Sequence, residues 1–120
     1  ALFLSVRCPG GLADLLFTNV LDNAVKFSPP GGHVVVDATA EGPEVVVAVS
    51  DEGPGIPQEE IPRVFERFYR GRAARGGDTA GFGLGLAISQ AVAEHQGGRL
   101  SVESASGGGA TFRVRLPVAP

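Results

Sequence analysis

The sequence predicts an α+β domain in which a mixed β-sheet carries helices layered on one face. Two segments have apolar residues at helical spacing, each is followed by β-rich runs that read as paired strands, and Gly- and Pro-rich turns separate the runs. The chain has 120 residues, the size of one ordinary domain. We therefore expect residues 1–120 to form a single domain that folds alone.

The first half of the chain holds the first helix and the first pair of strands. Apolar residues recur at helical spacing over residues 11–27, and the Ser-Pro-Pro-Gly-Gly run at 28–32 ends the helix because proline and glycine do not continue it. Residues 33–40 alternate in β fashion, residues 41–43 have turn chemistry, and residues 44–50 are a second β-branched run. These runs predict a hairpin.

The second half is punctuated by glycine and proline. We expect a turn at 51–57, a short helix at 58–67, a glycine-rich loop at 71–81, a helix at 84–96 that Gly97 and Gly98 close, and a hairpin of strands at 99–104 and 110–116.

Charge and hydropathy exclude two classes of partner. Ten Lys and Arg against 13 Asp and Glu give a net charge of -3, so we expect no long-range attraction to nucleic acid or to a membrane surface. No stretch approaches the roughly 20 apolar residues that span a bilayer. Any anion site must therefore be local.

The first helix has two different sides when residues are projected at about 100° each. One side suits a sheet-facing stripe, and it carries Phe17, Leu21, Ala24 and Val25; the opposite side carries Asn19, Asn23 and Lys26. Leu12, Leu15 and Leu16 share the second side, which is less uniform than a water-facing stripe. An Asn oxygen can bind Mg²⁺ and a Lys can meet phosphate. A solvated face and the wall of a nucleotide-metal site both remain open, and the leucines favour the wall.

Two glycine clusters, at residues 51–55 and 81–86, lie beside predicted elements. Each alone fits a structural turn. The second opens a helix, where backbone N–H groups and the helix dipole favour phosphate, but it has neither a Walker lysine nor the setting of a dinucleotide fingerprint. Asp51 either caps its turn or accepts a hydrogen bond from the exocyclic amine of adenine, which guanine lacks at that position.

Four motifs together resemble those of one protein family. Residues 19–28 (NVLDNAVKFS), 51–56 (DEGPGI), 65–70 (FERFYR) and 81–87 (GFGLGLA) are similar to the N, G1, F and G2 boxes of sensor histidine kinases, in that order. They cover nearly the whole chain, and their conjunction is highly specific. The resemblance identifies the chain as the catalytic ATP-binding domain of such a kinase, cut from a longer protein.

The resemblance implies a fold and a set of ligands. The fold is the Bergerat ATP-binding fold, shared with gyrase-type topoisomerases, ninety-kilodalton heat-shock chaperones and mismatch-repair ATPases: a two-layer α/β sandwich with a mixed five-stranded sheet and three helices on one face. The ligands are ATP and Mg²⁺, with the metal at Asn23. The implied catalytic residues are Asn23, Lys26 and Arg70. The implied nucleotide-binding residues are Asn19, Asn23, Lys26, Phe27, Asp51, Gly53, Gly55, Ile56, Tyr69, Gly81, Phe82, Gly83, Leu84, Gly85 and Leu86.

Within this superfamily the choice of activity depends on Asn19. ATPases of the fold usually carry a glutamate there as general base, and an amide cannot take the proton, so transfer is favoured over hydrolysis. We expect donation of the γ-phosphoryl group to a histidine on a dimerisation and acceptor domain of the same protein, with a response regulator downstream. His33 and His95 are expected to be surface residues, not the acceptor.

Two activities other than phosphoryl transfer remain open. Phe82 stands where Thr or Ser is usual, which keeps an inactive nucleotide-binding module open, and an ATP-hydrolysing domain is the third alternative. We expect the isolated domain to be monomeric and cytoplasmic, without nucleic acid or direct membrane contact, although the full protein can be membrane-anchored.

Overall fold

The computed structural model describes residues 10–67, 85–104 and 108–119. In chain order these form helix α1 (Gly10–Phe27), strands β1 (Val35–Glu41) and β2 (Glu44–Ser50), the 3-10 helix η1 (Ile61–Arg63), helix α3 (Gly85–His95), and strands β3 (Arg99–Ser104) and β4 (Ala110–Pro117). Both long helices and all four strands lie within two residues of their predicted bounds. Within these residues, no helix is long and apolar enough to cross a bilayer.

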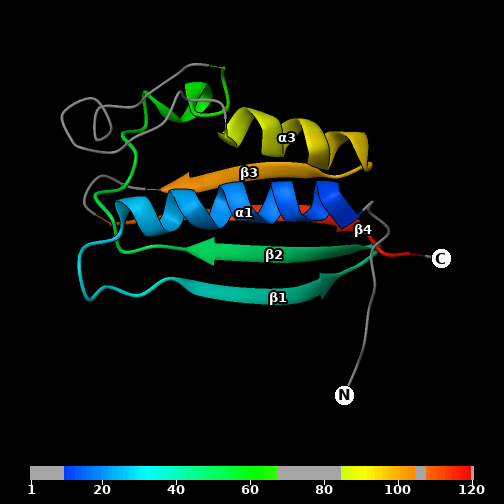
Figure 1. Ribbon diagram of the computed structural model, residues 1–120, viewed down its shortest axis with the longest axis horizontal. Helices are drawn as coiled ribbons and strands as arrows, with labels where there is room; N and C mark the ends of the chain where they lie inside the picture. The colour runs from blue at the N-terminus through cyan, green and yellow to red at the C-terminus, as the bar shows by residue number, and fades with distance from the viewer. Residues whose placement is uncertain (1–9, 68–84, 105–107, 120) are drawn as a thin grey trace.

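The strands form one sheet in the order β1-β2-β4-β3, and every neighbouring pair is antiparallel (Figure 1). Over the described residues the sheet thus has four antiparallel strands, and the fifth strand and the parallel pairing of the predicted mixed sheet are not among them. Each hairpin has a short connection, and short connections join antiparallel strands, whereas a parallel pair needs a crossover of a dozen or more residues. The long connection between the hairpins brings β4 back antiparallel to β2.

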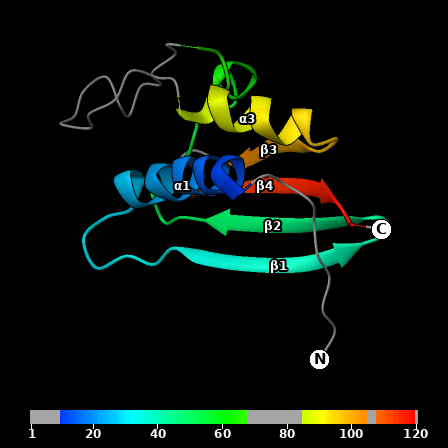
Figure 2. The ribbon, with the colours of Figure 1, turned by 45° about the vertical axis from the view of Figure 1, so that its right-hand side comes forward.

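Both helices lie on the same side of the sheet, as predicted (Figures 1 and 2). Helix α3 packs on β3 and β4, and α1 packs on β2 and along α3. Between these layers lies one apolar core, formed by Leu16, Val20, Ala24, Val49, Val92, Ala93, Leu100, Ala110, Phe112, Val114 and Leu116. The strand residues of this core alternate along β4, as expected when one face of a sheet is covered.

The buried stripe of α1 differs from the predicted one. Leu16, Val20 and Ala24 are fully buried, whereas Val25 is 64% exposed, so its placement on the sheet-facing stripe is wrong. Val25 follows Ala24 and is therefore turned by about 100° from it, which carries its side chain off the core. Leu16, which the projection placed beside the asparagines, is fully buried, and its carbonyl accepts a hydrogen bond from Ser89 Oγ of α3 at 2.9 Å.

The helix predicted at 58–67 is reduced to η1, a single 3-10 turn. Pro62 lies within it and lacks the N–H that the interior of an α-helix requires. Phe65 follows η1 and meets the ring of Phe112 edge-on, with centroids 6.2 Å apart and planes at 80°. This aromatic contact attaches the segment to the core in place of helical packing.

Strand β1 forms an edge of the sheet that neither helix covers (Figures 1 and 2). All seven of its residues are exposed, including Val35 and Val36. The core therefore lies beneath β2, β4 and β3, and these strands position the functional residues.

Truncation of Phe112 tests this description of the core. Phe112→Ala should lower the unfolding free energy by about 3–5 kcal/mol, because it removes a fully buried ring and leaves a cavity. Arg113→Ala, the neighbour on the open face of the sheet, should cost less than about 1 kcal/mol because it removes only an exposed ion pair with Glu103. Urea denaturation measures both. Equal losses in the two variants would contradict the assignment of faces.

Candidate functional site

One stripe of α1 joins the two glycine-rich motifs. Asn19, Asn23 and Phe27 follow at four-residue intervals, so they lie one above another along the helix, and all three are half-buried. They flank the fully buried stripe, which corrects the expectation that the asparagines face away from the core. At about 1.5 Å per residue, Asn19 and Phe27 are about 12 Å apart along the helix axis. A glycine of the G2 box adjoins one end and a glycine of the G1 box the other.

The Asn19 end meets the first residue of α3. A Cβ on Gly85 would lie 3.6 Å from the side-chain oxygen of Asn19. The Asn19 side-chain nitrogen, Nδ2, is buried and has no hydrogen-bond partner within the described residues. A buried donor left unpaired costs about 1–3 kcal/mol, and here it lies beside a helix N-terminus, which favours negative charge. This end therefore fits an anionic oxygen as the missing acceptor.

The Phe27 end meets the turn that follows β2. A Cβ on Gly53 would lie 2.5 Å from the carbonyl oxygen of Phe27, closer than any side chain can come. Gly55, two residues on, has φ of 77°, which favours glycine over every other residue. The two glycines predicted in this motif are thus required by the backbone, one for close approach and one for conformation.

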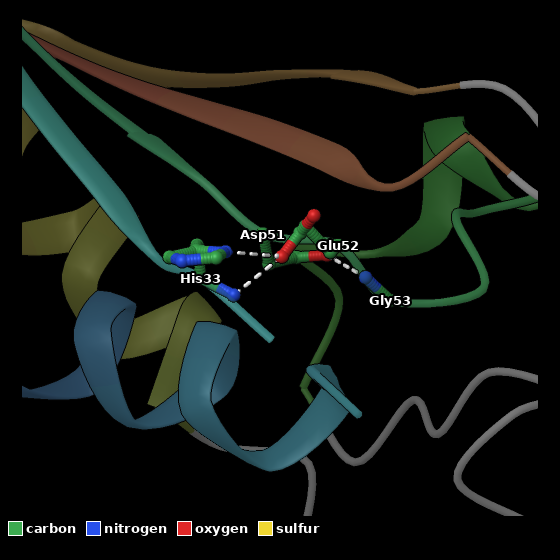
Figure 3. Close-up of polar contacts among 4 residues, drawn as sticks. All are labelled: His33, Asp51, Glu52 and Gly53. Atoms are coloured by element: carbon green, nitrogen blue, oxygen red, sulfur yellow. Dashed lines mark hydrogen bonds and ion pairs between the residues drawn. The ribbon is translucent and has the colours of Figure 1, made fainter. Parts of the chain in front are cut away.

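The Asp51 carboxylate is held by backbone groups on one of its oxygens. Oδ1 accepts hydrogen bonds from the Gly53 N–H at 2.9 Å (Figure 3) and from the Ala110 N–H at 3.3 Å. The Asp51 N–H donates to the Ala110 carbonyl at 2.9 Å. No hydrogen bond from the described part of the chain reaches Oδ2. The carboxylate is therefore fixed in orientation, with one oxygen available to a ligand.

Glu52 ties the same turn to the segment before β1. Its Oε1 accepts a hydrogen bond from the His33 backbone N–H and lies 3.2 Å from His33 Nδ1 (Figure 3). The backbone hydrogen bond is the main reason that the pKa of Glu52 lies below its usual value. The His33 side chain is 82% exposed, which confirms the prediction that it is a surface residue.

The other predicted residues divide into two groups. Lys26 is exposed in the last turn of α1, and Ile56 and Leu86 pack against the core. The remaining predicted residues lie outside the described ranges: Tyr69, Arg70, Gly81, Phe82, Gly83 and Leu84. The structure thus unites the N box, the G1 box and the start of α3.

Three residues of the β3–β4 hairpin support this site and were missed from the sequence. Ser104 bridges to Ile56, Gly109 touches Asp51, and Ala110 pairs with Asp51. These contacts join residues 48 to 59 positions apart, so no local motif indicates them. The only sequence feature that points to the place is the glycine run at 107–109 between two β-rich segments.

Residues 11–120 match the family described as histidine kinase-, DNA gyrase B-, and HSP90-like ATPases. The chain belongs to this family. It is 50% identical over 107 residues to the signal transduction histidine-protein kinase/phosphatase MprB of Mycobacterium sp. strain KMS, covering 85% of this chain and 20% of MprB. It is 42% identical over 101 residues to the sensor histidine kinase WalK of Bacillus subtilis, covering 82% of this chain and 16% of WalK. This ATPase-family chain thus spans about a fifth of these relatives.

Solved structures of sensor histidine kinases superpose closely on this chain. A structure of the mycobacterial sensor histidine kinase MprB superposes with a TM-score of 0.87 at 39% identity, covering 96% of this chain and 78% of that one. Full-length ShkA in complex with AMPPNP gives 0.81 at 33% identity, covering 98% of this chain and 24% of that one. The homologues of this chain are sensor histidine kinases, as the four motifs predicted.

The approach of Gly53 to α1 can be tested by adding one methyl group. Gly53→Ala should lower the unfolding free energy by about 1–3 kcal/mol, because the new Cβ must push the turn away from the Phe27 carbonyl. Gly11→Ala is the matched control, since a Cβ there meets nothing within 4 Å and alanine favours the helix. Thermal unfolding compares the two, and a Gly53→Ala protein as stable as the control would contradict the close approach.

The Glu52 contact predicts a pH dependence with a definite sign. Because folding lowers the pKa of Glu52 below 4.5, its stabilising effect is complete above that pH and is lost as the pH falls through the folded-state pKa. The urea midpoint of Glu52→Gln should therefore lie below that of the wild type at pH 7, and the gap should close on acidification below pH 4.5. Glu94→Gln, at an exposed position of α3, is the control. A gap that widens in acid would contradict the assignment.

Proposed function

We propose that this chain binds Mg-ATP and donates the γ-phosphoryl group to a histidine on a separate dimerisation and acceptor domain of the same protein, in two-component signalling. The observation that carries the proposal is the α1 stripe of Asn19, Asn23 and Phe27, which meets Gly85 of the G2 box at one end and Gly53 of the G1 box at the other. Family membership and the AMPPNP complex of ShkA support a nucleotide ligand.

The base end of the site is Asp51 with its glycine turn. Oδ1 is taken by backbone N–H groups, and Oδ2 accepts a hydrogen bond from the exocyclic amine of adenine. Gly53 keeps the turn against α1, so that no side chain of its own stands between the carboxylate and the base. Guanine has no amine at that position, so this arrangement selects adenine.

The phosphate end lies between α1 and the start of α3. Asn19 Nδ2 donates to a phosphate oxygen, which gives the buried amide an acceptor that no described residue supplies. Lys26 contributes a point charge, as does Arg70 from the F box. The side-chain oxygen of Asn23, one turn beyond Asn19, is the ligand for Mg²⁺, which typically takes one or two protein oxygens together with phosphate oxygens. Mg-ATP, when bound, supplies the transferable phosphoryl group and the metal charge that neutralises its oxygens.

Asn19 favours transfer over hydrolysis. It occupies the position one turn before Asn23 where a carboxylate would act as general base on water, and an amide cannot accept that proton. Phosphoryl transfer needs mainly positioning and charge neutralisation, so a domain of this kind can present ATP to a nucleophile on another domain. The rest of the full protein supplies that acceptor, a response regulator takes the phosphoryl group from it, and this domain lies on the cytoplasmic side.

Nucleotide binding is tested by titration calorimetry with Mg-ATP and Mg-GTP. Asp51→Asn should weaken ATP binding by about 10- to 100-fold, because a hydrogen bond to a charged group is lost or inverted, and should not weaken GTP binding, because an Asn amide can donate to the guanine carbonyl. Asp37→Asn, on the exposed edge strand β1, is the control and should bind ATP as the wild type does. Equal ATP affinity in Asp51→Asn and Asp37→Asn would contradict the placement of the base.

Transfer is tested by mixing the chain with Mg-ATP and a separately made acceptor-histidine domain. Phosphohistidine should form on the acceptor, and Asn23→Ala should abolish it. Tight ATP binding without any transfer would contradict the kinase activity, and multiple turnovers by the isolated chain would favour the hydrolysing ATPase.

A further inference from the structure

Ser104, the last residue of β3, makes two hydrogen bonds with its hydroxyl group. The Ile56 N–H donates to Oγ at 2.8 Å, and Oγ donates to the Gly109 carbonyl at 2.6 Å. A hydroxyl has one proton to give and two lone pairs, so both partners are satisfied in a single orientation. The side chain therefore acts as a two-way bridge.

The two partners of Ser104 lie at opposite ends of the turn at 51–56. Ile56 is its last residue, while Gly109 adjoins its first: a Cβ on Gly109 would lie only 2.2 Å from the Asp51 carbonyl oxygen. Ala110, the next residue, pairs with Asp51 through both backbone groups. The bridge thus closes a ring that runs from Asp51 through the turn to Ile56, across Ser104, and back through Gly109 and Ala110.

This ring fixes the direction of the Asp51 carboxylate. One donor to Oδ1, the Gly53 N–H, belongs to the turn, and the other, the Ala110 N–H, belongs to the hairpin. The position of Oδ2 therefore depends on how the turn sits against the hairpin. Gln58 Nε2 also donates to the Ser104 carbonyl, which adds a second tie on the same side.

We propose that Ser104 is a positioning residue for base recognition, and that its hydroxyl maintains the preference of the site for adenine over guanine. The inference rests on the proposed ATP site, because Asp51 must be the group that meets the base. Ser104 acts through Ile56 and Gly109 and touches no ligand itself. Without the hydroxyl, the turn shifts against the hairpin, and Asp51 Oδ2 leaves the position from which it accepts a hydrogen bond from the adenine amine.

The expected signature is confined to the base. The phosphate end, at Asn19 and Gly85, is about 12 Å away along α1 and is held by the packing of α1 on α3. Loss of the bridge should therefore weaken the binding of ATP. The binding of GTP, which makes no hydrogen bond to Oδ2, should stay nearly unchanged. A residue that only stabilised the fold would weaken both nucleotides alike or neither.

Calorimetric Kd values for Mg-ATP and Mg-GTP test the proposal in four proteins: wild type, Ser104→Ala, Ser104→Thr and Ser101→Ala. Ser104→Ala should lower the ratio of ATP to GTP affinity by about tenfold, the effect of one or two neutral hydrogen bonds. Ser104→Thr keeps the hydroxyl and should restore the ratio. Ser101 lies on the same strand opposite Arg113, on the open face of the sheet, so Ser101→Ala should match the wild type.

The outcomes separate the two proposals. If the wild type binds no ATP, the proposed function is overturned. If the wild type prefers ATP and Ser104→Ala has the same ratio of ATP to GTP affinity, this inference alone is overturned, even if the melting temperature of Ser104→Ala falls. If Ser104→Ala does not fold, amide hydrogen exchange in the wild type decides. The Ile56 N–H should exchange slowly without nucleotide, and exchange at the rate of an unprotected amide would overturn the bridge.

Discussion

The site depends on one close backbone contact, that of the turn after β2 with the last carbonyl of α1. Gly53 permits this contact because it has no Cβ to meet the Phe27 oxygen. The helix must also end at that carbonyl, and it does so because the Ser28 N–H closes the last turn on Ala24 at 3.1 Å and two prolines follow. The end of α1 and the bend of the turn after β2 therefore depend on each other.

The two ends of the site are supported by different parts of the fold. Asn19 is positioned by the packing of α1 along α3, in which the buried Ser89 hydroxyl donates to Leu16. Asp51 is positioned by the pairing of β2 with β4, which continues beyond the strands into its bonds with Ala110. Phe112 of β4 belongs to the single apolar core on which both supports rest. A change at one end can thus leave the other in place.

The sequence was sufficient for features that depend on neighbours along the chain. Helical spacing located α1 and α3, and β-branched runs located the strands. The glycine motifs singled out Gly53 and Gly85, although the contacts that these glycines make with α1 could not be predicted. The predictions that failed are those that depend on which distant residues pack together. Val25 was placed on the core because the projection alone does not say which side meets α3, and the helix at 58–67 was predicted although Pro62 interrupts it.

The contacts that hold the Asp51 turn in place could not be predicted from the sequence for the same reason. The contact of Ser104 with Ile56 and that of Glu52 with His33 depend on strand order and register, which set distant segments side by side. Either residue taken alone reads as an ordinary polar residue beside a turn. Only the motif residues, which carry their chemistry in local spacing, could be named in advance.

The bond between Asp51 and Ala110 spans 59 residues of chain. Closing so long a segment costs entropy that local structure does not return, so pairs of this kind form with the assembled sheet and not in isolated helices or hairpins. The geometry around Asp51 therefore belongs to the native state alone. Any ligand that requires it discriminates between folded and unfolded chains, and by mass action it stabilises the whole domain more strongly the further its concentration exceeds its Kd.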